Sequence, residues 1–421
     1  MKGLPVIIPV AAACAVAIPL ILRGATSEPE RPVYRDNLNT VITNGLSDIP
    51  DLKAMDCVVD SFMNFWALKG VSLAVTRNDS LLYAKGYGMA DETTPMTPGT
   101  TMRVASVSKL LTAVGIMKLQ EEGKVFLDTP VFGPYGVLKR FDPYIKDENY
   151  YLITVEHLLR HQAGFTTRGG DVMFSTLTFM RNYGLDKAPT AEILVRKQVG
   201  RRLSYVPGTW QDYSNFGYLL LSLVIEEVSG MPYEEYMQEH VFKPAGCSGF
   251  KIAGNYLKDR HPGESKYYMQ PDSEPVPSFD GSLATVEKCY GGNDVTSLMG
   301  AGAWVGSAVE MARLVCCIDG RGPMEDILSE ESVHQMTTWY DQDTFSLGWV
   351  DTKPDGEWTR TGSFSGTSAL VKVYPDGECW VLISNTSAWR GSRFSKNTAC
   401  LCKNLRRRFS GLMPARDLFR E

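Results

Sequence analysis

Segments with strand character lie at both ends of this 421-residue chain, and helical segments lie between them. Residues 70–91 contain two alternating β-rich runs around Asn78-Asp79, a pattern typical of a β-hairpin. We therefore expect an α/β protein of the α+β type, in which an antiparallel sheet is built from both ends of the chain and flanked by N- and C-terminal helices. Further strands are predicted over 346–350, 369–374 and 378–384, and a C-terminal helix over 395–409.

The folded part is predicted to run from residue 54 to residue 409, with an inserted all-helical domain over about residues 105–285. Residues 26–53 are polar, contain prolines and lack a hydrophobic period, which predicts a linker. Residues 410–421 are predicted to be a C-terminal tail. The hydrophobic fraction of 44% and the charged fraction of 22% are those of a globular protein with a substantial core.

Residues 1–25 depart from this average, because the run from Leu4 to Leu22 is uncharged and nearly all apolar between Lys2 and Arg23. Its length is close to the ~20 residues that span a bilayer as a helix and exceeds the ~7–15 apolar residues of a signal peptide. A retained transmembrane anchor is favoured over a cleaved signal. Either interpretation predicts contact with a membrane through residues 4–22 and an extracytoplasmic location, periplasmic if the source is bacterial.

Charge and cysteine spacing exclude other classes of function. The 43 Lys+Arg against 48 Asp+Glu give a net charge of -5, so no basic field exists to hold nucleic acid. The nine cysteines form no repeated CxxC pattern, which leaves a thiolate zinc site without support. His157 and His161 stand four residues apart, but Leu158 replaces the glutamate of the H-E-x-x-H motif, and structural roles are favoured for both.

The first motif with catalytic potential is Ser106-Val107-Ser108-Lys109. Positions three apart share a helix face, so the Ser106 hydroxyl and the Lys109 amine are expected side by side. A partly desolvated lysine has a lowered pKa and can accept the serine proton. The alternative is a serine helix cap with a solvated lysine.

The second motif is Tyr213-Ser214-Asn215. A phenol and an amide two residues apart can point into one cleft, the phenol as acid or base and the amide as donor to a substrate carbonyl. The alternative is a surface turn.

The third motif is Arg360-Thr361-Gly362-Ser363, expected just before a strand. A cation, a hydroxyl and a glycine at a strand edge can bind a substrate carboxylate and let the substrate lie close to the backbone. The alternative is a polar turn.

In this order, the three motifs resemble those of the serine β-lactamase and penicillin-binding protein superfamily, in its class C and serine-esterase branch. The family motifs are S-x-x-K, Y-x-N and K/H-T-G. The resemblance covers residues 54–409 and extends to further stretches at 153–165, 207–237, 300–314 and 346–349.

This resemblance implies a β-lactamase/transpeptidase-like fold and no metal or organic cofactor. Ser106 would be the acylated nucleophile, Lys109 and Tyr213 would transfer protons, and Asn215 would bind a substrate amide. Thr361, Gly362 and Ser363 would line the substrate site, and the backbone N–H groups of Ser106 and Ser363 would form the oxyanion hole.

Arg360 departs from the family pattern, which usually has Lys or His there. Its planar fork suits a carboxylate but cannot deliver a proton at neutral pH. Two interpretations stay open: Arg360 binds a substrate carboxylate, or it only sets the local electrostatic field.

The function predicted is that of a serine hydrolase that forms an acyl-enzyme on Ser106 with a small-molecule or peptide ester, amide or lactam. An esterase or D-peptidase is favoured over a dedicated β-lactamase. The rival hypothesis is a catalytically silent, penicillin-binding-like scaffold protein. The presence of Ser106, Lys109 and Tyr213 together favours the enzyme.

Overall fold

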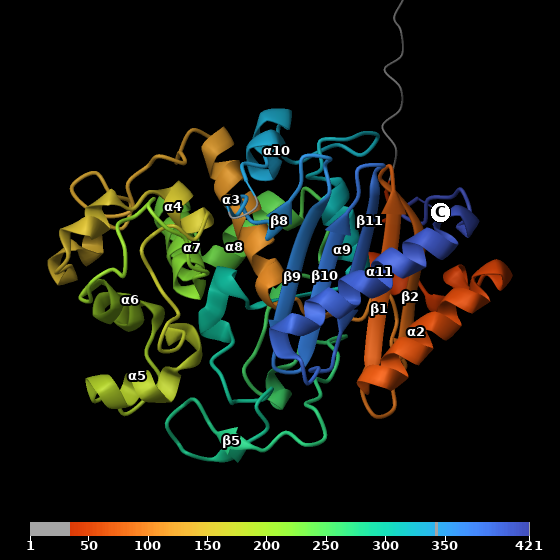
Figure 1. The fold of residues 1–421 in the computed structure, drawn as a ribbon, viewed down its shortest axis with the longest axis horizontal. Coiled ribbons are helices and arrows are strands. Elements are labelled where there is room, and N and C mark those ends of the chain that lie inside the picture. The colour runs from red at the N-terminus through yellow and green to blue at the C-terminus, as the bar shows by residue number, and fades with distance from the viewer. Residues whose placement is uncertain (1–33, 342–343, 421) are drawn as a thin grey trace, which may run out of the picture. The chain divides into compact units, whose positions relative to one another are not determined.

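A six-stranded antiparallel sheet organises the computed structural model, which describes residues 34–341 and 344–420. The strand order is β2-β1-β11-β10-β9-β8, so N-terminal β1 pairs with C-terminal β11 (Figure 1). The prediction of a sheet built from both ends of the chain is confirmed. The strands are β1 Gly70–Arg77, β2 Ser80–Gly88, β8 Asp351–Thr352, β9 Trp358–Phe364, β10 Thr367–Val373 and β11 Glu378–Ser384.

The predicted hairpin is formed by β1 and β2. Asn78 and Asp79 have φ angles of 45° and 61°, which are the left-handed values that a two-residue type I′ turn requires at both central positions. Asn and Asp tolerate this conformation better than other non-glycine residues do. The turn therefore sets the register of the two strands.

Helices cover both faces of the sheet. Helices α2 (Lys53–Trp66) and α11 (Ser395–Phe409) lie on one face, as Figure 1 shows, and α9 (Ala308–Cys316) contacts β1 and β11 from the other. In α2 the buried residues recur every three or four positions, as expected of an amphipathic helix. They are Met55, Val59, Met63 and Trp66.

The chain between β2 and β8 forms the inserted part, and it is not all helical as predicted. Its core is the pair α3 and α7, whose residues are mostly buried. Short strands pair within it: β3-β7-β4, from distant parts of the chain, form one small sheet and β5-β6 form another. The helices are α3 Ser108–Glu121, α4 Val155–Leu159, α5 Thr176–Tyr183, α6 Ala191–Val199, α7 Asn215–Ser229, α8 Tyr233–Met237 and α10 Glu330–Thr337, and the strands are β3 Met102–Arg103, β4 Lys251–Ile252, β5 Val276–Pro277, β6 Thr285–Val286 and β7 Trp304–Gly306.

The folded unit extends beyond the predicted limits of 54 and 409. Residues 34–53 are part of it rather than a linker, because α1 (Leu38–Val41) contacts α9 and Leu38 is buried. At the other end, Phe419 is buried and its carbonyl accepts a hydrogen bond from the Arg35 N–H at 2.8 Å. Both terminal segments are therefore held against the rest of the fold by buried apolar residues, among them Leu38 and Phe419.

The apolar run from Leu4 to Leu22 and residues 26–33 lie outside the described residues, so the membrane segment stays a prediction. Across residues 34–341 and 344–420, no helix combines the length and the apolar character needed to cross a bilayer.

The strand predicted over residues 346–350 is wrong, and the third motif lies inside a strand, β9, rather than before one. Gly348 has a φ of 83°, which an extended strand does not accommodate. Leu347 and Trp349, which gave this stretch its strand character, are buried in an irregular segment instead.

Candidate active site

The predicted nucleophile Ser106 lies in the tight turn η3 (Ala105–Val107), directly before α3. Ala105 has a φ of 48°, a left-handed conformation that is costly for a residue with a Cβ atom. Neighbouring contacts hold the turn: the Val104 N–H donates to the Trp304 carbonyl at 2.9 Å, and the Thr367 hydroxyl donates to the Arg103 carbonyl at 2.7 Å. Strained backbone that is held in this way is typical of functional sites.

Strand β9 lies directly against this turn because Gly362 has no side chain. A Cβ atom on Gly362 would stand 2.3 Å from the Val104 carbonyl oxygen and 3.0 Å from the Ser106 nitrogen. Any other residue would push β9 away from the nucleophile. The structure thus brings Gly362 and its neighbours Thr361 and Ser363 to Ser106, as the third motif predicts.

Lys109 is fully buried in the first turn of α3. Its Nζ donates to the Ser106 Oγ at 3.3 Å, to the Asn215 Oδ1 at 2.6 Å and to the Ala301 carbonyl at 2.5 Å. Burial lowers the pKa of Lys109 to about 8, and the nearby Arg360 cation acts in the same direction. Near this pH a large fraction of the amine is neutral and can accept a proton.

Tyr213 lies just before α7, with the Lys109 Nζ 4.8 Å from the centre of its ring. Its hydroxyl accepts a hydrogen bond from the Arg360 Nη2 at 3.3 Å. Burial raises the pKa of Tyr213, but the Lys109 and Arg360 cations outweigh burial, and the net pKa is lowered. The phenol is therefore poised to pass a proton between Ser106 and its surroundings.

Arg360 on β9 is buried, with 1% of its surface exposed. Its Nε donates to the Ser106 carbonyl at 2.8 Å, its Nη2 donates to the Tyr213 hydroxyl at 3.3 Å, and its Nη1 is buried. This geometry favours the second of the two interpretations above: Arg360 sets the local field and holds Ser106 and Tyr213, rather than binding a substrate carboxylate.

Asn215 begins α7, where the Ser214 side chain caps the helix by accepting from the Gly217 N–H. The Asn215 Oδ1 accepts from Lys109, and its Nδ2 donates to the Asp171 Oδ2 at 2.6 Å. One of the two amide hydrogens is thus used within the protein, and the other is left for the predicted contact with a substrate carbonyl.

Two residues contact this site in ways that the sequence did not indicate. His161, predicted to be structural, is buried with its ring centroid 4.5 Å from that of Tyr213, and its Nδ1 accepts from the Ser214 N–H at 3.1 Å. Burial, with Lys109 and Arg360 nearby, lowers the pKa of His161 well below its usual value. A neutral His161 thus supports both Tyr213 and the start of α7.

The second residue is Asp171, which accepts from the Asn215 Nδ2. It follows Gly169-Gly170 in a loop without hydrophobic period.

His157 and His161 have different hydrogen-bond partners. It caps α4 together with Thr154, whose hydroxyl accepts from the His157 N–H. His157 therefore stabilises the start of α4, and His161 stabilises the start of α7.

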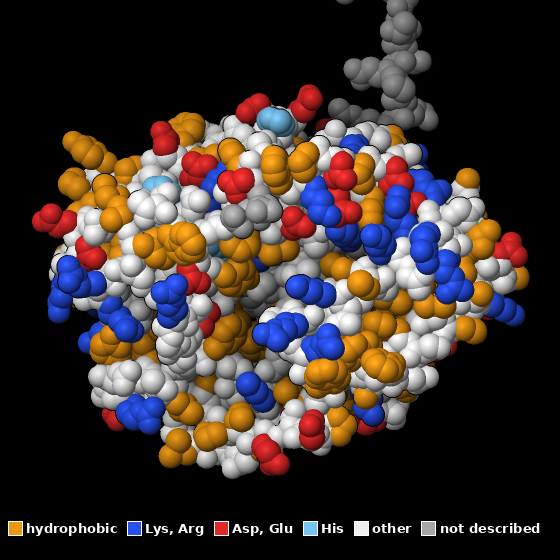
Figure 2. All heavy atoms as spheres, in the orientation of Figure 1, with side chains coloured by type: hydrophobic (Ala, Val, Ile, Leu, Met, Phe, Trp, Pro, Cys, Tyr) orange, Lys and Arg blue, Asp and Glu red, His pale blue; other side chains and the backbone are white. Residues whose placement is uncertain are grey.

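Two cavities adjoin the predicted site, and Figure 2 shows this face of the molecule hollowed between the helical part and the sheet. One, of about 420 Å³, includes Ser363 and Phe364 from β9 with Lys288 and Trp389. The other, of about 240 Å³, includes Asp171 and Ser214. Neither cavity is lined by Ser106 itself, but Ser106 is only half-buried and lies against strand β9, which also carries Ser363.

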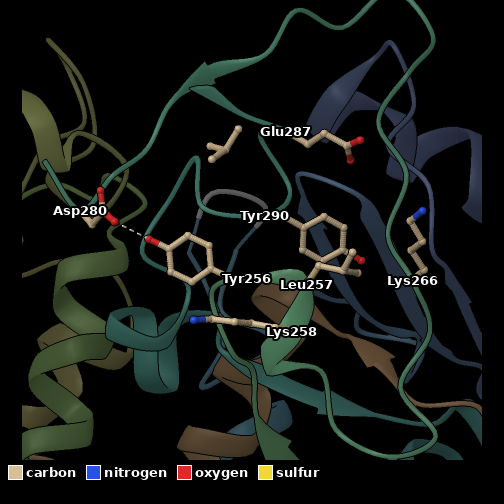
Figure 3. A pocket seen from close by; sticks show the side chains of 8 residues that line it. Tyr256, Leu257, Lys258, Lys266, Asp280, Glu287 and Tyr290 are labelled. Carbon is tan, nitrogen blue, oxygen red and sulfur yellow. Dashed lines mark hydrogen bonds between the residues drawn. The ribbon is translucent and has the colours of Figure 1, made fainter. Parts of the chain in front are cut away.

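A larger cavity, of about 720 Å³, contains none of the predicted site residues (Figure 3). Tyr256 and Tyr290 form its aromatic walls, and the Tyr256 hydroxyl donates to Asp280 at 2.8 Å. Its lining comes from the 256–290 region and does not belong to the reactive centre. The residues are Tyr256, Leu257, Lys258, Lys266, Asp280, Val286, Glu287 and Tyr290.

The fold and this site define a serine hydrolase in which a lysine and a tyrosine flank the nucleophile. The family model described as Beta-lactamase matches residues 58–401, and the chain belongs to this family. The resemblance inferred from the motifs is confirmed.

Relatives and solved structures extend this result. The chain is 26% identical over 328 residues to the putative penicillin-binding protein PbpX of Bacillus subtilis. The matched region covers 77% of this chain and 72% of the relative. It is 28% identical over 246 residues to the esterase EstB of Burkholderia gladioli, covering 55% of this chain and 60% of the relative. The D-amino acid amidase of Ochrobactrum anthropi SV3 has the same fold, with a TM-score of 0.66, 20% identity, and coverage of 87% of this chain and 100% of that one.

Proposed function

We propose that this serine hydrolase of the Beta-lactamase family cleaves ester or amide bonds through an acyl-enzyme on Ser106. One observation carries the proposal: the buried Lys109 amine lies 3.3 Å from the Ser106 Oγ and 4.8 Å from the centre of the Tyr213 ring. This arrangement supplies a nucleophile together with two groups that exchange its proton.

In the first step, the Ser106 Oγ attacks the substrate carbonyl carbon. Its proton passes to the neutral Lys109 amine or through the Tyr213 hydroxyl, while the C–O bond forms and the carbonyl oxygen becomes an oxyanion. We propose that the backbone N–H groups of Ser106 and Ser363 stabilise this oxyanion. The close approach of Gly362 to the Ser106 nitrogen supports that role.

In the second step, the tetrahedral intermediate collapses, the bond to the leaving alcohol or amine breaks, and the leaving group takes the proton back through Tyr213. Water then attacks the acyl carbon and gives its proton to the same pair. The bond between the acyl carbon and the Ser106 Oγ breaks, the Oγ takes that proton back, and the acid is released. Arg360, through the Ser106 carbonyl and the Tyr213 hydroxyl, holds both groups in place.

Esters and amides, D-peptides among them, are the proposed substrates rather than β-lactams. The names of relatives support this class, since they include an esterase and a putative D-alanyl-D-alanine carboxypeptidase of Escherichia coli O157:H7. Within this class, the burial of Arg360 supports neutral esters, because its hydrogen bonds go to the Ser106 carbonyl and the Tyr213 hydroxyl. Nothing favours the silent scaffold, since the nucleophile and its partners are assembled.

Labelling with a fluorescent fluorophosphonate tests the proposal. Wild type and a Ser61→Ala control should be labelled equally, because Ser61 is an exposed serine on α2. Ser106→Ala should not be labelled. Labelling of Ser106→Ala at the wild-type rate would show that another residue is the nucleophile.

We also propose that the run from Leu4 to Leu22 delivers the hydrolase to a membrane or beyond the cytoplasm. Its uncharged, apolar composition between Lys2 and Arg23 supports this location. Fractionation of cells that express the full chain, compared with a chain lacking residues 1–23, tests the proposal. Equal recovery of both chains in the cytoplasm would overturn it.

A further inference from the structure

Asp171 connects the loop before α5 to the centre of the site. It caps the short helix η6 (Val172–Phe174), where its Oδ1 accepts from the Met173 N–H at 2.9 Å. Its Oδ2 accepts from the Asn215 Nδ2 at 2.6 Å, and the Asn215 Oδ1 in turn accepts from Lys109 at 2.6 Å. A continuous chain of short hydrogen bonds therefore joins a carboxylate to the lysine beside the nucleophile.

The chemistry of this chain allows only one orientation of the Asn215 amide. An ionised carboxylate only accepts hydrogen bonds, so the Asn215 NH₂ group must face Asp171, and the Asn215 oxygen must then face Lys109. The flipped amide would set its oxygen against the carboxylate and its NH₂ group against the lysine, two repulsive contacts. Asn215 is 6% exposed, so water has little access to relieve them.

We propose that Asp171 is a positioning residue that fixes the Asn215 amide, and through it places the Lys109 amine beside Ser106. This inference rests on the proposed function and adds a residue that the three motifs do not contain. In this arrangement Asn215 orients Lys109 as well as facing the substrate.

Titratable groups from four elements surround Lys109, and removing the Asp171 carboxylate shifts the pKa of Lys109 in a defined direction. Tyr213 before α7 and Asp171 before η6 raise the pKa of Lys109, Arg360 on β9 lowers it, and His161 after α4 is a nearby neutral group. Without the Asp171 carboxylate, the pKa of Lys109 falls, and the amine stays neutral to lower pH.

The test compares Asp171→Asn and Asp171→Ala with Asp147→Asn as a matched control. Asp147 is also a capping aspartate of the inserted part, because its two oxygens accept from the Asn149 and Leu203 N–H groups. We expect both Asp171 variants to lower kcat with a neutral ester by about 10- to 100-fold, because a misplaced catalytic group costs on this order. The acid limb of the pH profile of kcat/KM should move to lower pH. Asp147→Asn should keep both the wild-type kcat and the wild-type limb.

Wild-type kcat in Asp171→Asn, or a loss without any movement of the acid limb, would overturn the positioning role. These results are distinct from a failure of the proposed function, which Ser106→Ala reports separately. Should Asp171→Ala fail to fold, the isosteric Asp171→Asn still decides the question.

Discussion

The molecule buries charged groups in several places, and two of these places differ in how the charge is compensated. On the outer face of the sheet, Glu378 of β11 is 2% exposed on its side chain, and guanidinium groups of Arg77 and Arg406 pair with it at 2.7 Å and 2.9 Å. In the reactive centre, Lys109 donates to hydroxyl, amide and carbonyl oxygens, and Arg360 to a carbonyl and a phenol.

The difference in partners distinguishes a structural ion-pair cluster from a candidate catalytic site. Burial raises the pKa of Glu378, but hydrogen bonds from Ser410, Trp380 and Arg77 outweigh it, and the carboxylate stays ionised with its pKa lowered. The cations of the reactive centre have mostly neutral partners, and Lys109 has its pKa lowered to about 8. Buried charge without matching countercharge is typical of sites that move protons.

The largest effect is expected from Lys109→Met, which keeps the side-chain length and removes the amine. The value of kcat/KM for an ester should fall by about 10²- to 10⁴-fold, the usual contribution of a general base. The melting temperature should stay the same or rise, because burying an ammonium group costs free energy. Near-normal ester hydrolysis by a natively melting Lys109→Met protein would show that Lys109 is not the base.

Glu378→Gln should show the opposite behaviour, with stability lost and activity kept. Removing the carboxylate leaves Arg77 and Arg406 facing each other, which we expect to cost about 2–3 kcal/mol of unfolding free energy. Denaturant unfolding measures this loss. Glu239→Gln, which breaks the exposed pair with Lys243, is the matched control, and it should change stability by less than about 1 kcal/mol. Equal effects of the two variants would remove the contrast between the buried cluster and the surface.

Arg360→Lys tests whether the guanidinium fork matters. A single ammonium group cannot span the Ser106 carbonyl and the Tyr213 hydroxyl in the geometry of the fork, so we expect kcat for a neutral ester to fall by about 10-fold, with KM little changed. A rise in KM confined to carboxylate-bearing substrates would instead identify Arg360 as a carboxylate ligand.

The smallest effects are expected from changes of pH. The activity, which depends on Lys109, and the stability, which depends on Glu378, should change over different pH ranges. Activity should rise as the pH increases through about 8, because Lys109 loses its proton there. Glu378 has its pKa lowered from 4.5, so its contribution to stability is present above pH 4.5 and is lost as the pH falls through the folded value below it. Melting curves from pH 3 to 9 should show the acid loss in wild type and a weaker one in Glu378→Gln. An unchanged acid loss in that variant would contradict the assignment.

Local patterns predicted much of this fold. The Asn-Asp turn predicted the β1–β2 hairpin from two residues, and the helix predicted over residues 395–409 is observed as α11. The motif Ser106 to Lys109 likewise predicted two side chains on one helix face, and the 3.3 Å contact between them agrees with that expectation.

Long-range contacts determine what the sequence did not predict. The sequence predicts Arg360 to Ser363 just before a strand, but pairing with β10 makes them part of the strand β9. Asp171 stands in a glycine-containing loop without period, and only the fold brings it to Asn215, 44 positions away. His161 gives no sign in the sequence of the Tyr213 ring against which it packs.

Intact-protein mass spectrometry after incubation with a panel of activated esters, amides and a β-lactam tests the central claim most directly. The claim predicts a covalent mass increase equal to the acyl group, mapped to the peptide containing Ser106, and absent in Ser106→Ala. An adduct on any other residue, or turnover that persists in Ser106→Ala, would contradict it.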